Sequence, residues 1–85
     1  MPFQDRLRKV FVTALDLGPE VDVEHLAQRV DPNWDSVGHM GLVVAIEDEF
    51  GVEFAPGDVV DMDSFEAAVR IVRSLAEGSG IDLEA

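Results

Sequence analysis

The sequence predicts a small all-α protein, a four-helix bundle of three long helices and one short helix with a long first loop. The chain has 85 residues, of which 47% are hydrophobic, which is enough for one small domain with a thin core. Apolar residues recur at helical spacing in three separate segments. Turn signals rich in Gly, Pro, Asp and Asn separate these segments from one another.

The first helix is expected at about residues 3–17, where Gly18-Pro19 should end it. Its apolar face consists of Phe3, Leu7, Val10, Phe11, Ala14 and Leu15. Residues 18–35 then form a loop whose length is unusual in compact domains and often functional. Residues 22–27 could form one helical turn within it. Four apolar side chains are expected to pin this loop to the core, namely Val21, Val23, Leu26 and Val30.

The second helix is expected at about residues 36–50, with Gly51 as its C-terminal stop. A short helix is expected at about residues 57–61, and the last helix at about residues 64–77. Residues 78–85 are expected to be a frayed tail. The whole chain, residues 1–85, is therefore expected to be a single domain.

The charge of the chain is one-sided, because 18 acidic residues face six basic ones and the net charge is −12. From residue 31 to residue 68 there is no Lys or Arg, while Asp and Glu recur throughout. Such a chain is not expected to bind nucleic acid or anionic membranes, and it should attract partners with basic surfaces. A solvated acidic surface that only aids solubility is the alternative.

The absence of cysteine excludes disulfides, thiol nucleophiles and thiolate zinc sites. No segment has the about 18 consecutive apolar residues that a transmembrane helix needs. The N-terminus has no uninterrupted apolar stretch typical of a secretory signal. The expected location is therefore the cytoplasm, where the chain is expected to act as a freestanding monomer, with an excised domain as the alternative.

The second helix carries two apolar stripes when it is drawn on a wheel at about 100° per residue. One face, expected to be the core, consists of Leu42, Val43, Ile46 and Phe50. The opposite face consists of Val37, Met40 and Val44, with Glu47 and Asp48 at its edge. An exposed apolar stripe with carboxylates at its rim is typical of a docking surface. The alternative is that another element, such as the long loop, covers this stripe.

Ser36 stands at the expected start of this helix, where unpaired N–H groups and the positive end of the helix dipole favour an anion. A phosphate on Ser36 would therefore be stabilised by the backbone. Gly38 is expected to leave room there for a bulky group or for the backbone of a partner. An ordinary N-cap role is the alternative for Ser36, and it is the expected role of Ser64 before the last helix.

Other chemistries have less support in the sequence. Ser36 and His39 are three residues apart, but no G-x-S-x-G motif accompanies them, which disfavours a serine hydrolase. His25 and His39 are not spaced as metal ligands, and are expected at the surface or packed against a loop. One acidic run is spaced like part of a calcium loop but lacks its glycine and glutamate, namely Asp58, Asp61 and Asp63. No metal site is expected.

The stretch WDSVGHMGLVVAIEDEFGVEF, residues 34–54, resembles the acyl carrier protein family. The matching elements are Asp35-Ser36-Val37, where the family has D-S-L, and the block from Ala45 to Glu53. The resemblance extends over essentially the whole chain and implies the four-helix bundle of acyl carriers. It also implies that Ser36 carries 4′-phosphopantetheine through a phosphodiester. The terminal thiol of that arm would hold an acyl group as a thioester, which suits a chain without cysteine.

The resemblance further implies a carrier that is not an enzyme. A phosphopantetheinyl transferase would attach the arm from coenzyme A, and acyl-loading and acyl-processing enzymes with basic docking surfaces would bind the second helix. By resemblance, the positions that these partners recognise are Asp35, Val37, Met40, Val44, Glu47 and Asp48.

Two glycines bear on the pathway. Carriers of primary fatty acid synthesis usually have acidic residues soon after the serine, where this chain has Gly38 and Gly41. The chain is more similar to discrete carriers of specialised metabolism, in polyketide or extender-unit pathways. A primary fatty acid carrier, an aminoacyl or peptidyl carrier of a nonribosomal pathway and an unmodified acidic helical adaptor are the alternatives. The substitutions Gly38→Asp and Gly41→Glu are expected to stabilise the helix slightly and to change which enzymes the carrier serves.

Overall fold

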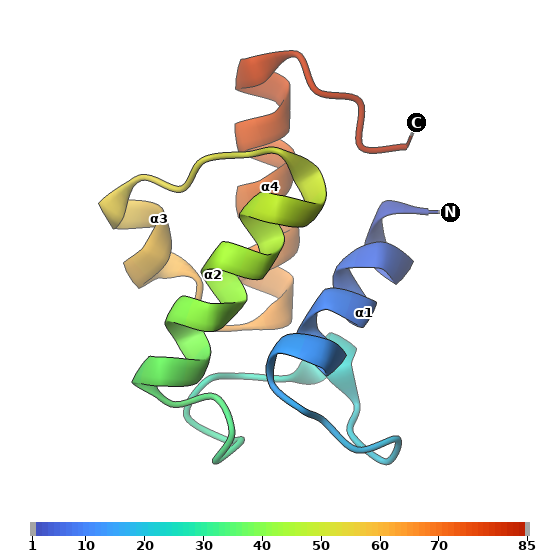
Figure 1. Ribbon diagram of the computed structural model, residues 1–85, viewed down its shortest axis with the longest axis vertical. Coiled ribbons are helices and arrows are strands. Elements are labelled where there is room, and N and C mark those ends of the chain that lie inside the picture. The colour runs from blue at the N-terminus through green and yellow to red at the C-terminus, as the bar shows by residue number, and fades with distance from the viewer. Residues whose placement is uncertain (1, 85) are drawn as a thin grey trace.

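Three long helices and one short helix make up the fold in the computed structural model, which describes residues 2–84 (Figure 1). The helices are α1 (Phe3–Ala14), α2 (Ser36–Phe50), α3 (Pro56–Asp61) and α4 (Phe65–Ser79). A 3₁₀ turn, η1 (Val23–His25), lies in the long loop between α1 and α2. The all-α bundle with a long first loop, as expected from the sequence, is therefore confirmed. No helix within the described range is long and apolar enough to cross a membrane.

The end of α1 differs from the expectation, because the helix stops at Ala14 and not at residue 17. Asp16 has a φ of 52°, in the left-handed region, so the chain leaves the helix before it reaches Gly18-Pro19. The N–H of Leu17 donates to the carbonyl oxygen of Val12 at 3.0 Å and closes this turn. The change of direction lets Leu15 and Leu17 both enter the core.

Side-chain and backbone caps define α2 and α4. Asp35 is the N-cap of α2, and its Oδ1 accepts a hydrogen bond from the N–H of Gly38 at 2.8 Å. Gly51 ends this helix with a φ of 72°, in the left-handed conformation that glycine adopts without a steric penalty. Ser64 caps α4, since its Oγ accepts from the N–H of Ala67 at 3.0 Å. The structure thus gives α2 the bounds expected from the sequence.

Residues 78–84 do not form a frayed tail, which corrects the expectation. α4 continues through Ser79, and Gly80 ends it with a φ of 69°. The chain then returns to the start of α1, where Nη1 of Arg6 donates to the carbonyl oxygen of Leu83 at 3.2 Å. Leu83 is buried, so the last turn of chain belongs to the core. Ala85, the end of the expected tail, and Met1 lie outside the described residues.

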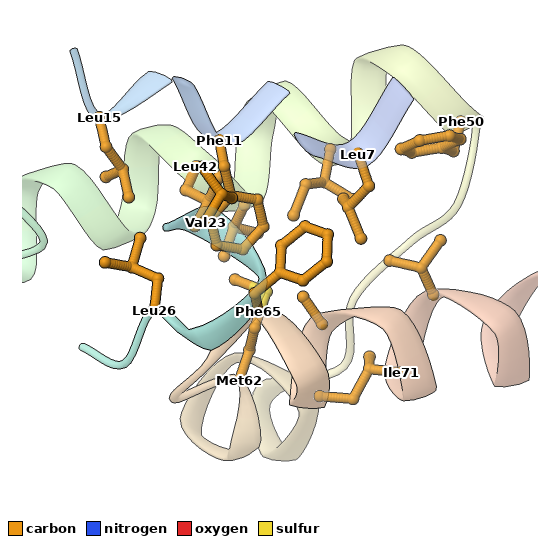
Figure 2. Packing of buried hydrophobic residues seen from close by; sticks show 14 of the residues in the cluster. Leu7, Phe11, Leu15, Val23, Leu26, Leu42, Phe50, Met62, Phe65 and Ile71 are labelled. Atoms are coloured by element: carbon orange, nitrogen blue, oxygen red, sulfur yellow. The ribbon is translucent and has the colours of Figure 1, made fainter. Parts of the chain in front are cut away.

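The core forms where α1, α2, α4 and the first loop meet (Figure 2). The Phe11 ring makes edge contacts with the rings of Trp34 and Phe65, with centroids 5.3 and 5.1 Å away. The four residues expected to form the core face of α2 are all buried, namely Leu42, Val43, Ile46 and Phe50. The apolar stripe that faces inward was therefore assigned correctly.

The first loop is attached to the bundle by backbone hydrogen bonds as well as by apolar contacts. The N–H of Gln28 donates to the carbonyl oxygen of Asp63 at 2.9 Å, next to the start of α4. Of the four side chains expected to pin the loop, two are buried, one is half-buried and one is exposed: Val23, Leu26, Val21 and Val30, in that order. The expectation for Val30 was wrong, because this side chain is 75% exposed.

Candidate functional site

Ser36 is the first residue of α2 and is exposed. The preceding residue, Asp35, is the N-cap, so the N-cap role considered for Ser36 is wrong. Within residues 2–84 the Ser36 hydroxyl has no hydrogen-bond partner, and it therefore remains available for a covalent modification. The sequence could not settle which of two adjacent capping residues, Asp35 or Ser36, takes the cap.

The backbone around Ser36 is suited to a negatively charged group. Asp35 accepts hydrogen bonds from the N–H groups of Gly38 and His39, through Oδ1 and its carbonyl oxygen respectively. Helix geometry leaves the N–H groups of Ser36 and Val37 without an acceptor inside the helix. Together with the dipole of a 15-residue helix, these two groups favour an anion on Ser36. The carboxylate of Asp35 opposes this effect, but it is occupied by the N–H of Gly38.

The apolar stripe on α2 lies at the surface. Val37 is 82% exposed, Met40 52% and Val44 53%. The alternative that the long loop covers the stripe is wrong, because the loop packs on the other side of the helix with Trp34 in the core. Val60 of α3, the helix that lies beside α2 in Figure 1, is 78% exposed as well. Exposed apolar side chains therefore occur on both helices.

The carboxylates around this stripe are not equivalent. Asp35 and Asp48 are exposed, and Asp48 lines a groove of about 480 Å³ between α1 and α2. Glu47 is half-buried, and its Oε2 accepts from the N–H of Phe54 at 2.8 Å. Glu47 therefore holds the loop that leads to α3, which periodicity alone did not indicate. The apolar side chain of Phe54 is half-buried and packed against the core, and this brings the backbone of the loop close to Glu47.

The acidic charge of the segment from residue 31 to residue 66 is largely uncompensated. Among the described residues, Glu49 is the one carboxylate of this segment that forms an ion pair, with Arg6 at 3.0 Å. The other ion pairs lie on α1 and the first loop, where Arg8 binds Asp5 and Glu24. Those hydrogen bonds, with that to Asp5 the larger cause, raise the pKa of Arg8. This segment thus offers acidic charge at the surface to cationic partners.

His39 is buried in the core, whereas Ser36 is exposed. The His39 side chain is 8% exposed, and its Nδ1 accepts from Nε1 of Trp34 at 2.8 Å. Its Nε2 lies 2.7 Å from the carbonyl oxygen of Val59, so both ring nitrogens are engaged. A base with no free nitrogen cannot accept the proton of the Ser36 hydroxyl. The geometry therefore does not support the hypothesis of a serine hydrolase, which the sequence already disfavoured.

The structure explains why position 38 is a glycine, for a reason that the sequence did not indicate. A Cβ at this position would lie 2.5 Å from the carbonyl oxygen of Asn33 and 3.2 Å from Cδ2 of Leu15. The expectation that Gly38 leaves room for a partner is therefore wrong, since the first loop already occupies that space. Around Gly41, in contrast, no atom lies within 4 Å of the position of a Cβ. Gly41 is thus the glycine that thins the exposed surface.

His25 lies in η1 at the surface, which is one of the two environments expected for the histidines. Its Nδ1 is 2.7 Å from Oδ2 of Asp22, and this hydrogen bond is the main reason that the pKa of His25 is raised. The charges of Asp22, Glu24 and Glu66 act in the same direction. Within residues 2–84, no three His, Asp or Glu side chains come close enough together to hold a metal ion.

The sequence did not indicate a role for Trp34, whereas the expectation that a histidine packs against a loop is confirmed for His39, whose ring stacks on Trp34. Trp34 is 2% exposed and packs between Phe11 and the imidazole of His39. A signal for His39 was present, because a step of about 100° per residue puts it at about 200° from Val37, on the core face. What periodicity cannot supply is the partner of its Nε2, which lies 20 positions along the chain.

Comparisons with known proteins agree with this geometry. No protein-family model matches the chain. A curated acyl carrier protein of Zymomonas mobilis is 32% identical over 68 residues, which is 80% of this chain and 87% of that protein. Acyl carrier protein 3 of Ralstonia nicotianae is 29% identical over 89% of this chain and 87% of its own length. The solution structure of a holo acyl carrier protein from Geobacter metallireducens matches with a TM-score of 0.78 at 24% identity, covering 93% of this chain and 91% of that chain.

Proposed function

The chain belongs to the acyl carrier protein family, and we propose that Ser36 carries its covalent 4′-phosphopantetheine arm. Proteins of this family are carriers and not enzymes, and the arm supplies the thiol that holds an acyl group as a thioester. The observation that carries the proposal is the position of Ser36, exposed on the first residue of a helix whose N-cap is another residue. A phosphodiester there would interact with the N–H groups of the first turn.

The proposed role leaves the working thiol to the arm, because the chain contains no cysteine. In this chain the residues position the arm and present it, while partner enzymes perform the chemistry. Asp35 fixes the start of α2, and Gly38 allows the first loop to pack closely behind it. Ser36 is thereby held at one rigid corner of the bundle.

The partners are a phosphopantetheinyl transferase and acyl-loading or acyl-processing enzymes with basic docking surfaces. We propose that they contact Val37, Met40 and Val44 and the flanking carboxylates of Asp35 and Asp48. The exposure of the three apolar side chains and the unpaired acidic charge around them support this surface. Glu47 belongs to the same region, but its hydrogen bond to Phe54 makes its contribution to recognition indirect.

A polyketide-type pathway, including the supply of extender units, is the pathway that we propose. The support is Gly41, which leaves α2 without an acidic side chain at an open surface position. Gly38 no longer contributes, since packing against Asn33 accounts for it. Fatty acid and nonribosomal pathways are separated from this one by loading assays. Efficient turnover with ketosynthase and extender-loading partners, and poor turnover with fatty acid and adenylating enzymes, is the expected result.

The attachment itself is tested by incubating the protein with coenzyme A and a broad-specificity phosphopantetheinyl transferase, and then measuring the intact mass. We expect the mass of one arm on the wild type and on Ser64→Ala, and none on Ser36→Ala. Ser64 is the matched control because it also stands at the start of a helix, where it serves as the N-cap.

Two outcomes would contradict the proposal. If the wild type gains no mass, the chain is an unmodified acidic adaptor, whose binding to basic partners should then be unchanged by Ser36→Ala. If Ser36→Ala still gains one arm, another side chain is the attachment point. Circular dichroism of the variants checks that loss of modification does not reflect loss of the fold.

A further inference from the structure

His39 connects three parts of the fold beside the proposed attachment point. The first loop contributes Trp34, whose indole donates to Nδ1, and α3 contributes the carbonyl oxygen of Val59 next to Nε2. The imidazole and indole rings are stacked, with centroids 6.0 Å apart and an interplanar angle of 20°. Within residues 2–84, His39 is the one buried polar side chain. It is therefore a bridge between the loop, α2 and α3.

The partners of His39 define its tautomer. The indole nitrogen of Trp34 is a donor only, so Nδ1 of His39 must accept and carries no hydrogen. The hydrogen of the neutral ring then lies on Nε2 and is donated to the carbonyl oxygen of Val59. Each polar atom of the bridge thus has its partner, and none is left unsatisfied in the core. Any separation of α3 from α2 at this point breaks the hydrogen bond to Val59.

We infer that His39 is a positioning residue that locks α3 against α2 and keeps the tethered acyl group outside the bundle. The inference rests on the proposed function of Ser36. Ser36 and His39 are three residues apart in α2, a rise of about 4.5 Å along the helix axis. An acyl chain that entered the core beside its attachment point would have to separate His39 from Val59. That would leave a donor and an acceptor unpaired in apolar surroundings.

The interior behind this bridge is filled with side chains. Leu42 and Met62, both visible in Figure 2, are fully buried, and Trp34 is 2% exposed. The large grooves lie elsewhere on the surface and have polar edges, one between α1 and α2 and one beside Arg29 and Ser64. The cargo that suits this arrangement is a small or polar acyl group, which gains little from an apolar interior.

The test compares butyryl and octanoyl thioesters of the wild type, made by a broad-specificity phosphopantetheinyl transferase that moves the acylated arm from the acyl-coenzyme A onto Ser36 of the apo protein. The intact mass is measured first, so that a failure to load counts against the proposed function and not against this inference. The rate of thioester cleavage by hydroxylamine and the backbone NMR shifts of α2 and α3 are then measured. Equal cleavage rates for the two thioesters, with the same shifts at Leu42 and Met62, are expected. Several-fold slower cleavage of the octanoyl thioester, with shifts at Met62, would overturn the inference.

Variants at position 39 show whether His39 excludes the acyl group from the bundle or only stabilises the fold. His39→Ala removes the bridge, and we expect it to slow cleavage of the octanoyl thioester relative to the butyryl one on the order of tenfold, because apolar methylenes become buried. His39→Gln keeps a donor and an acceptor and should restore equal rates, while His25→Ala, at an exposed histidine, should behave as the wild type. Equal rates in a folded His39→Ala protein would contradict the inference.

If His39→Ala does not fold, the wild-type comparison and the imidazole ¹⁵N shifts of His39 decide. A bare Nδ1 and a protonated Nε2 are expected at neutral pH. A hydrogen on Nδ1 would show that the bridge to Trp34 does not exist.

Discussion

The carbonyl oxygen of Asn33 lies 2.5 Å from the point where a Cβ on Gly38 would be. A real Cβ essentially never approaches an oxygen so closely, and a backbone carbonyl cannot turn away as a flexible side chain can. The contact allows the first loop to run directly against the start of α2. The position of Ser36 therefore depends on a glycine two residues further along the helix.

Gly38→Ala is expected to destabilise the protein and Gly41→Ala to stabilise it. In an open helical position, Ala is favoured over Gly by about 0.5–1 kcal/mol. At Gly38 the added methyl must push Asn33 aside, and overpacking of this kind costs about 1–3 kcal/mol. Urea unfolding of the two variants measures both effects.

Gly41 is the matched control in this pair, because both glycines lie in the interior of the same helix. A gain of stability in both variants would contradict the close approach of Asn33 to α2. The same reasoning reverses the expectation from the sequence for Gly38→Asp, which should now destabilise the helix. Gly41→Glu keeps the expectation of a slight gain.

Glu47 and Asp48 are neighbours with different predicted effects. Glu47→Ala removes the acceptor of the Phe54 N–H and should lower the free energy of unfolding by about 1–2 kcal/mol. Asp48→Ala removes an exposed carboxylate and should change it by less than about 0.5 kcal/mol. Denaturant unfolding measures the free energy of unfolding of both variants.

The role of Asp48 in docking is tested by transferase kinetics of the wild type and of Asp48→Ala at low and high salt. Asp48→Ala should raise the KM for the carrier, with an effect that shrinks as salt screens the interaction. An unchanged KM at low salt would remove Asp48 from the proposed docking surface. A loss of stability in Asp48→Ala equal to that of Glu47→Ala would contradict the different environments of the two carboxylates.

The returning C-terminal segment is predicted to contribute to stability. Leu83→Ala should cost about 2 kcal/mol, the lower end of the range for a buried leucine. Lys9→Ala, at an exposed position of α1, should stay within about 0.5 kcal/mol of the wild type. Thermal or urea unfolding of both variants tests this, and equal stabilities would mean that the segment is loosely attached.

The pair of His25 and Asp22 should make stability depend on pH. Its hydrogen bond raises the pKa of His25 in the folded state, so protonated His25 binds Asp22 more favourably than the neutral form does. The contribution is complete below the unfolded pKa of about 6.5, and it is lost as the pH rises through the raised folded pKa. His25→Gln should therefore be less stable than the wild type at acidic pH.

The measurement is the urea midpoint of the wild type and of His25→Gln at about pH 5.5 and at about pH 9. The difference between the two proteins should decrease at the higher pH. Because the pair is exposed, added salt should reduce the difference as well. A difference that is larger at the higher pH would contradict the raised pKa of His25.

The sequence predicted some elements better than others, for physical reasons. α2 has strong local signals at both ends, since Asp35 caps its start and the left-handed Gly51 stops it. The end of α1 has no such signal, because an aspartate at position 16 is compatible with a helix and with a left-handed turn alike. The returning tail packs through Leu83 and the half-buried Ile81, two isolated apolar residues that no periodicity identifies.

Some features of the candidate site could likewise be predicted from the sequence and others could not. The exposed stripe on α2 could be predicted because it is a property of one helix, and the structure leaves Val37, Met40 and Val44 exposed as expected. The roles of Gly38 and His39 could not, because they depend on where other segments lie. Asn33 approaches Gly38 from the loop, and Val59 approaches His39 from α3.

The attachment of the arm to Ser36 is tested most directly by its position in a peptide. Trypsin cuts after Arg29 and Arg70 with no Lys or Arg between them, so one peptide of the holo protein contains both Ser36 and Ser64. In tandem mass spectrometry, we predict that the mass of the arm stays with fragments that contain Ser36 and is absent from those that contain only Ser64. An arm on Ser64, or a peptide without added mass after treatment with coenzyme A and transferase, would contradict the account.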